Sequence, residues 1–263
     1  MLDLQLKDKV ALVTAASKGL GKAAAWELAR QGARVALCAR GRETLTTAQE
    51  IQADTNSQVL GVRADLTVAA DIRKFVAVAM QEFGKIDVLI INAGGPKSGQ
   101  FLALNESDWL DAVQLTLMSA VRLCYEVVPI MLAQDGGCIV ASQSVSVKQP
   151  VDNLVLSNSV RLSVIGLMKS LANELGPKGI RVNSINPGNI FTDRTVYLLE
   201  DRARVNDSSY ERELEKETAG IPLKRMGTLD GYGQTVAWLA SPAAGYLHGQ
   251  ALVYDGGLVQ FPL

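Results

Sequence analysis

The amino-acid sequence predicts a doubly wound α/β fold, in which helices cover both faces of a parallel seven-stranded sheet. Two observations lead to this prediction. Seven short apolar segments rich in β-branched residues alternate with amphipathic helical patterns along the 263 residues. These segments are apolar on both faces, which is typical of parallel strands that are buried between two helical layers and joined by right-handed crossovers.

The expected elements follow one another in a regular order. Strands are expected in KVALVTAA from Lys9, ARVALCA from Ala33, QVLGVRA from Gln58, IDVLIINAG from Ile86, CIVASQS from Cys138, IRVNSINPG from Ile180 and ALVYDGG from Ala251. Amphipathic patterns predict helices over 21–32, 71–84 and 106–137. Several of them end in the glycine that is favoured just past a helix C-terminus.

One segment interrupts this alternation. Residues 192–220, TDRTVYLLEDRARVNDSSYERELEKETAG, are dense in charge and longer than an ordinary connection between a strand and a helix. We expect a helical lid here, because such an insertion more often covers a site than forms a second domain. No linker or repeat divides the rest of the chain, so residues 1–263 are interpreted as a single domain.

Charge and cysteine content exclude several classes of protein. Lys and Arg number 26 against 27 Asp and Glu, with no basic block, which argues against nucleic-acid binding. No stretch reaches the roughly 18 uncharged apolar residues of a membrane span, and the N-terminus lacks a signal-peptide pattern. Cys38, Cys124 and Cys138 are far apart and the chain has one histidine, so neither a disulfide framework nor a metal site is expected. We therefore expect a cytoplasmic protein.

A glycine-rich turn follows the first expected strand. Residues 14–21, TAASKGLG, lead directly into a helix, where a doubly wound sheet holds a pyrophosphate on free backbone N–H groups. Glycine also serves any tight strand-to-helix turn, so the pattern alone indicates nucleotide binding weakly. Its place as the first such turn strengthens the interpretation.

Four motifs make the chain resemble the classical short-chain dehydrogenases/reductases, in particular the 3-oxoacyl-acyl-carrier-protein reductase group. They are TAASKGLG (14–21), INAG (91–94), PGNIFT (187–192) and a C-terminal segment over 222–257. The resemblance covers nearly all of the chain and implies a Rossmann-type dinucleotide-binding domain. Ala15 stands where the family has its first glycine, and we expect this change to cost little because alanine is only one methyl group larger.

The resemblance implies a cofactor site along the carboxyl edge of the sheet. The residues it assigns there are Thr14, Ser17, Lys18, Gly19, Leu20, Gly21, Arg40, Asp65, Leu66, Asn92, Ala93, Gly94, Arg161, Pro187, Gly188, Ile190 and Thr192. NAD-preferring members carry an acid after the second strand, whereas this chain has Arg40, with Lys18 expected nearby. We therefore expect NADP(H) to be preferred over NAD(H). The alternative is that both cations are merely solvated surface charges.

Asp65 has two interpretations. It is similar to the family's acid that holds the adenine amino group. It could equally cap the helix that follows it.

The family's catalytic tetrad of Asn, Ser, Tyr and Lys is largely replaced. By resemblance, its four positions fall on Thr116, Ser144, Ser157 and Arg161, so only the serine at 144 remains. A serine hydroxyl is far too weak an acid to replace a tyrosine, and it reaches less far. Arg161 keeps the positive charge that could hold the ribose hydroxyls, but it cannot exchange protons as lysine does. Cofactor binding is expected to persist, without the proton relay.

Two other residues could take part, and a third is expected not to. Lys148 is expected to face the pocket, and so is Tyr197, which belongs to the expected lid. Both residues are alternative proton donors. The single histidine, His248, is expected to be structural.

Three functions stay open. The first is an NADP(H)-dependent oxidoreductase that acts on a carbonyl or hydroxyl compound with an atypical proton donor. The second is a catalytically degenerate dinucleotide-binding or regulatory protein, and the third is a non-redox enzyme such as a lyase or isomerase. By resemblance, a homotetramer is expected through the helices over 106–133 and about 153–175, whose apolar residues exceed one buried face.

Overall fold

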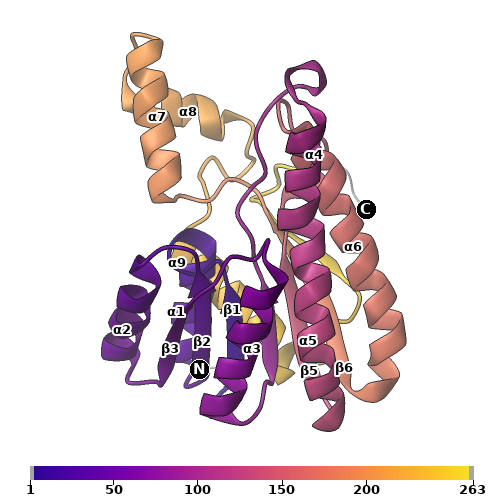
Figure 1. Ribbon diagram of the computed structural model, residues 1–263. Helices are drawn as coiled ribbons and strands as arrows, with labels where there is room; N and C mark the ends of the chain where they lie inside the picture. The colour runs from indigo at the N-terminus through magenta and orange to yellow at the C-terminus, as the bar shows by residue number, and fades with distance from the viewer. Residues whose placement is uncertain (1–2, 261–263) are drawn as a thin grey trace.

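A parallel seven-stranded sheet forms the centre of the computed structural model, which describes residues 3–260 (Figure 1). The strand order is β3-β2-β1-β4-β5-β6-β7, which confirms the predicted doubly wound sheet. The strands are β1 (Val10–Thr14), β2 (Arg34–Ala39), β3 (Val59–Arg63), β4 (Val88–Ile91), β5 (Gly137–Ser142), β6 (Ile180–Pro187) and β7 (Ala251–Tyr254). The order reverses between β1 and β4, where ligands of such sheets bind at the carboxyl ends of the strands.

Helices cover both faces of the sheet. α1 (Gly19–Arg30), α2 (Glu43–Thr55) and α9 (Leu229–Ala240) pack on one face, and α3 (Ala69–Phe83), α5 (Ser119–Ala133) and α6 (Val155–Leu175) on the other. Successive residues of one strand enter opposite cores: Leu12 packs with the α3, α5 and α6 layer, and Val13 with the α1, α2 and α9 layer. This explains the strands that are apolar on both faces.

The helix expected from residue 106 onward is continuous but not uniform. It consists of α4 (Glu106–Ala112), a π-helical segment (Val113–Met118) and α5. Within residues 3–260, the stretch Glu106–Ala133 is the one helix long and apolar enough to cross a membrane by length and composition. Leu123 and Val127 of this stretch are fully buried in the core against the sheet, so it is a core helix of the fold.

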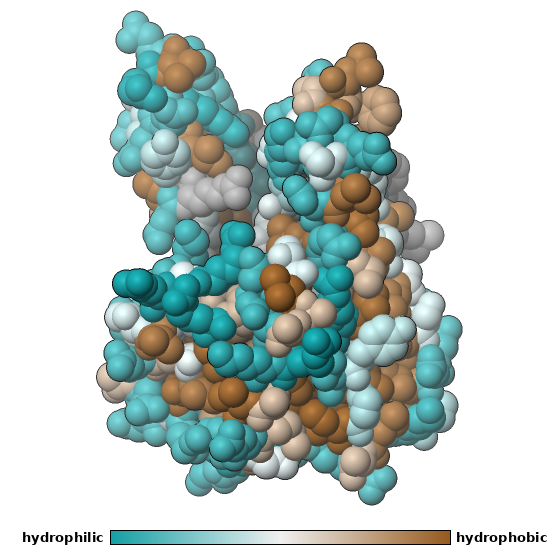
Figure 2. Space-filling model, viewed as in Figure 1, coloured by the Kyte–Doolittle hydropathy of each residue, from teal (hydrophilic) through white to brown (hydrophobic). Residues whose placement is uncertain are grey.

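The charged segment after β6 folds into two helices, α7 (Asp193–Val205) and α8 (Tyr210–Ala219). Each begins at a hydroxyl cap, because Thr192 accepts a hydrogen bond from the Thr195 N–H and Ser209 accepts one from the Arg212 N–H. The pair projects away from the sheet (Figure 1). Figure 2 shows a cleft between this mostly hydrophilic helix pair and the part of the chain that carries α4. Short 3₁₀ turns at Phe101–Ala103, Val145–Val147, Gly176–Lys178 and Pro242–Ala244 complete the elements.

Candidate cofactor and active site

The turn between β1 and α1 is tight and depends on two glycines. Gly19 has a φ of 57°, and a Cβ on Gly21 would lie 2.4 Å from the Ala15 carbonyl oxygen. Lys18, the N-cap of α1, makes no side-chain capping hydrogen bond. The first N–H groups of α1 and the positive end of its dipole are therefore available to an anion. These residues fit the diphosphate of a dinucleotide.

The structure corrects the expectation that an alanine at position 15 costs little. Its φ is 48°, in the left-handed region that favours glycine. The relevant effect is therefore backbone strain and not the size of the methyl group, and it is worth roughly 1–2 kcal/mol for a residue with a Cβ. The alanine is tolerated because the surrounding contacts fix the turn.

Asn92 provides part of that support. Its Nδ2 donates to the carbonyl oxygens of Thr14 at 3.3 Å and Ala15 at 3.2 Å, and its backbone N–H donates to Thr14 Oγ1 at 2.9 Å. Thr14 Oγ1 in turn donates to the Asn92 carbonyl oxygen at 2.7 Å. Thr14 and Asn92 thus join the ends of β1 and β4, the strands between which the sheet order reverses. Ala93 and Gly94 follow directly at the same edge.

Four predicted cofactor residues from distant parts of the chain line one cavity of about 280 Å³. They are Leu20, Gly188, Ile190 and Thr192. The other lining residues come from the segment after β6 and from α7 and α8. Pro187 ends β6 just before this cavity. The motif after β6 and the glycine turn therefore meet as the resemblance implies.

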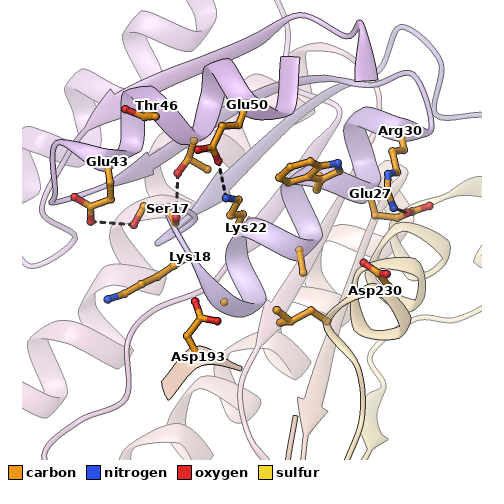
Figure 3. A pocket seen from close by; sticks show the side chains of 15 residues that line it. Ser17, Lys18, Lys22, Glu27, Arg30, Glu43, Thr46, Glu50, Asp193 and Asp230 are labelled. Carbon is orange, nitrogen blue, oxygen red and sulfur yellow. Dashed lines mark hydrogen bonds and ion pairs between the residues drawn. The ribbon is translucent and has the colours of Figure 1, made fainter. Parts of the chain in front are cut away.

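Three further predicted residues, Ser17, Lys18 and Gly19, line a groove of about 540 Å³ between α1, α2 and the start of α7 (Figure 3). Carboxylates share this groove. Glu43 lies 3.4 Å from the Ser17 hydroxyl, which donates to it, and Glu50 pairs with Lys22 at 2.7 Å. The groove therefore carries charges of both signs.

Asp65 lies close to the end of β2. Its Oδ1 accepts hydrogen bonds from the Thr67 N–H at 2.9 Å and the Thr67 hydroxyl at 2.8 Å, whereas the N-cap of α3 is Val68. The helix-capping interpretation is thus wrong, because the carboxylate closes a turn before the helix begins. Burial raises the pKa of Asp65, but the Thr67 hydrogen bonds and the charge of Arg40 outweigh it and hold the pKa below its usual range. Leu66 is buried beside it.

Ser157 and Arg161 lie one turn apart on α6, and both are buried, each 6% exposed. Arg161 Nε donates to Ser157 Oγ at 3.1 Å, and the Ser157 and Ser146 hydroxyls lie 3.1 Å apart. Arg161 Nη1 points to the carbonyl oxygen and to Oε1 of Gln143, both at 3.3 Å. In this arrangement the guanidinium is turned back onto the protein, so Arg161 is not extended toward a ribose.

Arg161 is a buried cation without a carboxylate partner among the residues described. Burial lowers the pKa of Arg161 to about 10, and the interaction with Tyr232 opposes this shift. The guanidinium is therefore protonated at neutral pH. It supplies a fixed positive charge and hydrogen-bond donors, and it does not exchange a proton in that range.

The other predicted catalytic residues lie in or next to segments that contact α6. Ser144 follows β5, and its side chain accepts a hydrogen bond from the Ser146 N–H at 3.2 Å. Thr116 lies in the π-helical segment, and its buried Oγ1 has no hydrogen-bond partner within residues 3–260. Lys148 ends the 3₁₀ turn after Ser144 and is partly exposed. π-Helical segments are frequent at functional sites, which suits the position of Thr116.

Three residues of this region were not found from the sequence. Gln143 and Ser146 complete the hydrogen bonds of Arg161 and Ser157; Gln143 falls near the end of the expected strand over 138–144, and Ser146 lies just beyond it. Tyr232 of α9 is buried, and its hydroxyl donates to Ser142 Oγ at 2.7 Å. Burial raises the pKa of Tyr232 to about 12, although the Ser142 hydrogen bond and the Arg161 charge oppose it. The sequence signal that could have found Gln143 and Ser146 is the presence of polar residues next to the end of a strand.

Two side chains stand apart from this region. Tyr197 is 66% exposed on α7 and is not among the residues that line the 280 Å³ cavity. His248 Nδ1 accepts a hydrogen bond from the Val182 N–H at 3.2 Å, and its Nε2 lies 2.7 Å from the Ala172 carbonyl oxygen. The histidine thus joins β6 to α6. Within residues 3–260, no group of three His, Cys, Asp or Glu side chains could hold a metal ion.

Comparison with known proteins places this geometry in context. The family model described as enoyl-(acyl carrier protein) reductase matches residues 14–259. The 3-oxoacyl-(acyl-carrier-protein) reductase FabG of Staphylococcus epidermidis is 33% identical over 255 residues, which are 95% of this chain and 99% of the relative.

Two solved structures are also similar. L-Sorbose reductase from Gluconobacter frateurii, complexed with NADPH and L-sorbose, has a TM-score of 0.96 and 29% identity, over 99% of this chain and 100% of that one. A short-chain oxidoreductase from Pseudomonas aeruginosa PAO1, described as containing an atypical catalytic center, has a TM-score of 0.90 and 26% identity. That similarity covers 96% of this chain and 98% of the other.

Proposed function

The chain belongs to the short-chain dehydrogenase/reductase family of oxidoreductases, and we propose on this basis that it is an NADP(H)-dependent enzyme with an atypical proton donor. It would transfer hydride to or from a carbonyl or hydroxyl group of a small molecule. The observation that carries the proposal is the combination of the free N-terminus of α1 at the glycine turn with the buried Ser157–Arg161 pair.

Several features support the cofactor. The free N-terminus of α1 would hold the diphosphate, and Gly21 lets the helix start pack closely against Ala15 and Asn92. Leu20, Gly188, Ile190 and Thr192 would contact the bound dinucleotide, because they line one cavity beside the start of α1. When bound, the dinucleotide supplies or accepts the hydride. The protein's own residues bind and orient it.

The preference for NADP(H) rests on Arg40. It follows β2, where an acid would accept the ribose 2′-hydroxyl of NAD, and its charge acts on Asp65 across the same strand ends. A guanidinium there suits a 2′-phosphate. The similar L-sorbose reductase was crystallised with NADPH, which agrees with this choice.

Arg161 would perform the electrostatic part of the chemistry. By exchanging its Gln143 contacts for a substrate oxygen, the protonated guanidinium at the carboxyl end of β5 would stabilise negative charge there, in the manner of an oxyanion hole. Ser144 Oγ would bind the same oxygen. Neither group supplies a proton efficiently, so water or Lys148 would deliver it. The absence of a tyrosine acid should slow turnover by roughly 10²- to 10⁴-fold relative to a complete tetrad.

A purely dinucleotide-binding role is the second candidate, and one observation favours it. Three hydrogen bonds of Arg161 already go to Ser157 and Gln143, so the guanidinium could be a structural replacement for a lost catalytic pair. A non-redox reaction in the same pocket, by a lyase or isomerase, has no comparable observation in its favour.

The proposal extends to the assembly and its environment. Tyr125 is 76% exposed on α5, and Leu110 and Leu162 are exposed on α4 and α6. These apolar side chains suit contact with other copies of the chain, as expected of a homotetramer. Cys38, Cys124 and Cys138 are free and buried, which suits a reducing cytoplasm. Residues 1–263 would act as one domain.

A binding titration tests the proposal. NADPH and NADH are titrated separately by the fluorescence of the reduced nicotinamide, and turnover is then followed with ketones, quinones and 3-oxoacyl thioesters. We expect tighter binding of NADPH and slow turnover of at least one carbonyl compound. Binding of neither dinucleotide would refute the proposal, and tight binding without turnover would favour the binding role.

A further inference from the structure

One carboxylate joins both lid helices to the loop that follows β6. Glu217 of α8 accepts a hydrogen bond from Asn189 Nδ2 at 3.0 Å, and it pairs with Arg202 of α7. Asn189 directly follows Gly188, which the resemblance assigns to the cofactor site. Glu217 therefore links α7 and α8 to the loop that carries Gly188, in addition to the hydrogen bond that Thr195 Oγ1 donates to the Ile190 carbonyl oxygen.

The same three residues line the 280 Å³ cavity together with Leu20 at the start of α1. The N-terminus of α1 favours an anion, whereas the carboxylate of Glu217 on the same cavity repels one. Among the described residues that line this cavity, Arg202 is the one cation. Its side chain is 51% exposed, so it has room to change partners.

We propose that Arg202 is a cofactor-binding residue that Glu217 holds in place until the dinucleotide binds. The guanidinium then donates hydrogen bonds to oxygens of the diphosphate, for which its planar donors are suited. The inference rests on the proposed dinucleotide cofactor. It assigns a direct binding role to a lid residue outside every motif of the sequence.

The exchange of partners is physically reasonable. The Arg202–Glu217 pair is partly exposed, at 51% and 26% of the two side chains, and such pairs contribute little stability. A diphosphate carries more negative charge than one carboxylate and offers several acceptors. Glu217 keeps its hydrogen bond with Asn189 after the exchange, so the lid stays attached while Arg202 moves.

Opposite effects of two substitutions test the inference. We expect R202Q to weaken NADPH and NADH alike, by about tenfold, because a charge-assisted hydrogen bond is lost. We expect E217Q to tighten both, because it removes a competitor for Arg202 and a negative charge from the cavity, while the amide oxygen still accepts from Asn189. A purely structural latch would give the same sign for both variants, since each breaks the ion pair.

Two controls make the test specific. R204Q alters a neighbouring arginine that pairs with Asp201 and does not line the cavity, so it should leave both affinities unchanged. Adenosine 2′,5′-bisphosphate has no diphosphate, so R202Q should not change its affinity. Thermal unfolding without ligand shows that each variant is folded.

The outcomes separate this inference from the proposed function. If the unmodified protein binds neither dinucleotide, the proposed function fails and this inference fails with it. If it binds NADPH and R202Q binds equally well, Arg202 is not a cofactor residue. Weaker binding by E217Q, parallel to R202Q, would likewise overturn the inference and leave the proposed function intact.

Discussion

Arg161 donates a hydrogen bond from Nε to the hydroxyl of Ser157, 3.1 Å away and one turn earlier on α6. By resemblance these are the positions of a lysine and a tyrosine in related enzymes. In this chain the guanidinium contacts Ser157 on one side and Gln143 on the other. The arrangement keeps positive charge at the end of β5 without a group that titrates near neutral pH.

Restoring the missing pair should raise activity. We expect the double substitution S157Y/R161K to increase turnover by roughly 10²- to 10⁴-fold, because a tyrosine beside a lysine supplies general acid catalysis. The measurement is the steady-state rate with the best carbonyl substrate of the panel. S159Y is the matched control, since Ser159 lies on the exposed side of α6. An equal gain in the control, or none in the double variant, would contradict the assignment of these positions.

The pH dependence of reduction should lack a tyrosine titration. Because burial lowers the pKa of Arg161 to about 10, its cation is present below that pH and is lost above it. We therefore expect a nearly constant rate from about pH 6 to about pH 9, with a decline as the pH passes about 10. The profile is measured at saturating NADPH.

Lys148 is the alternative source of the proton. K148M should leave the rate and the profile unchanged if Arg161 and water suffice. A loss of turnover that removes a titration from the profile would assign the proton to Lys148.

Arg40 should determine the choice of dinucleotide. R40D places a carboxylate where a 2′-phosphate is expected, so we expect NADPH to bind at least about tenfold more weakly and NADH no more weakly than before. The dissociation constants of both are measured by titration. R73D, which changes an exposed arginine of α3, is the control for net charge. Equal weakening in the two variants would show that Arg40 acts only as a surface charge.

Tyr232 should matter for stability. Y232F leaves the buried Ser142 hydroxyl without its partner at 2.7 Å, so the free energy of unfolding should fall by about 1–3 kcal/mol. Urea denaturation measures the change. Y246F is the control, because Tyr246 is fully exposed and its substitution should have an effect within about 0.5 kcal/mol. Similar values for both variants would mean that the Ser142 contact adds no stability.

Much of the fold could be predicted from the sequence, because strands buried on both faces have a distinctive composition. The order of β1 and β4, and the meeting of Leu20 with Thr192, follow from that topology and the motifs. The strain at Ala15 could not be read from residue size, because it depends on φ. The role of Asp65 could not be decided from the sequence either, because an aspartate carboxylate accepts hydrogen bonds from backbone N–H groups both in a turn and at a helix N-cap.

The candidate site was less accessible to sequence reasoning. Spacing placed Ser157 and Arg161 on one face of a helix, but not the turn of the guanidinium toward Gln143. Such contacts depend on side-chain conformation and on loops without a periodic pattern. The Glu217 contacts with Asn189 and Arg202 join three segments of the chain, and no local sequence pattern predicts them.

Transfer of deuterium tests the central claim most directly. The protein is incubated with NADPH that carries deuterium at the transferred position of the nicotinamide, together with the carbonyl panel, and the products are examined by mass spectrometry. The account predicts an alcohol with one deuterium on the former carbonyl carbon, formed slowly by the unmodified protein and faster by S157Y/R161K. Bound NADPH with no labelled alcohol from either protein would contradict the proposed hydride transfer.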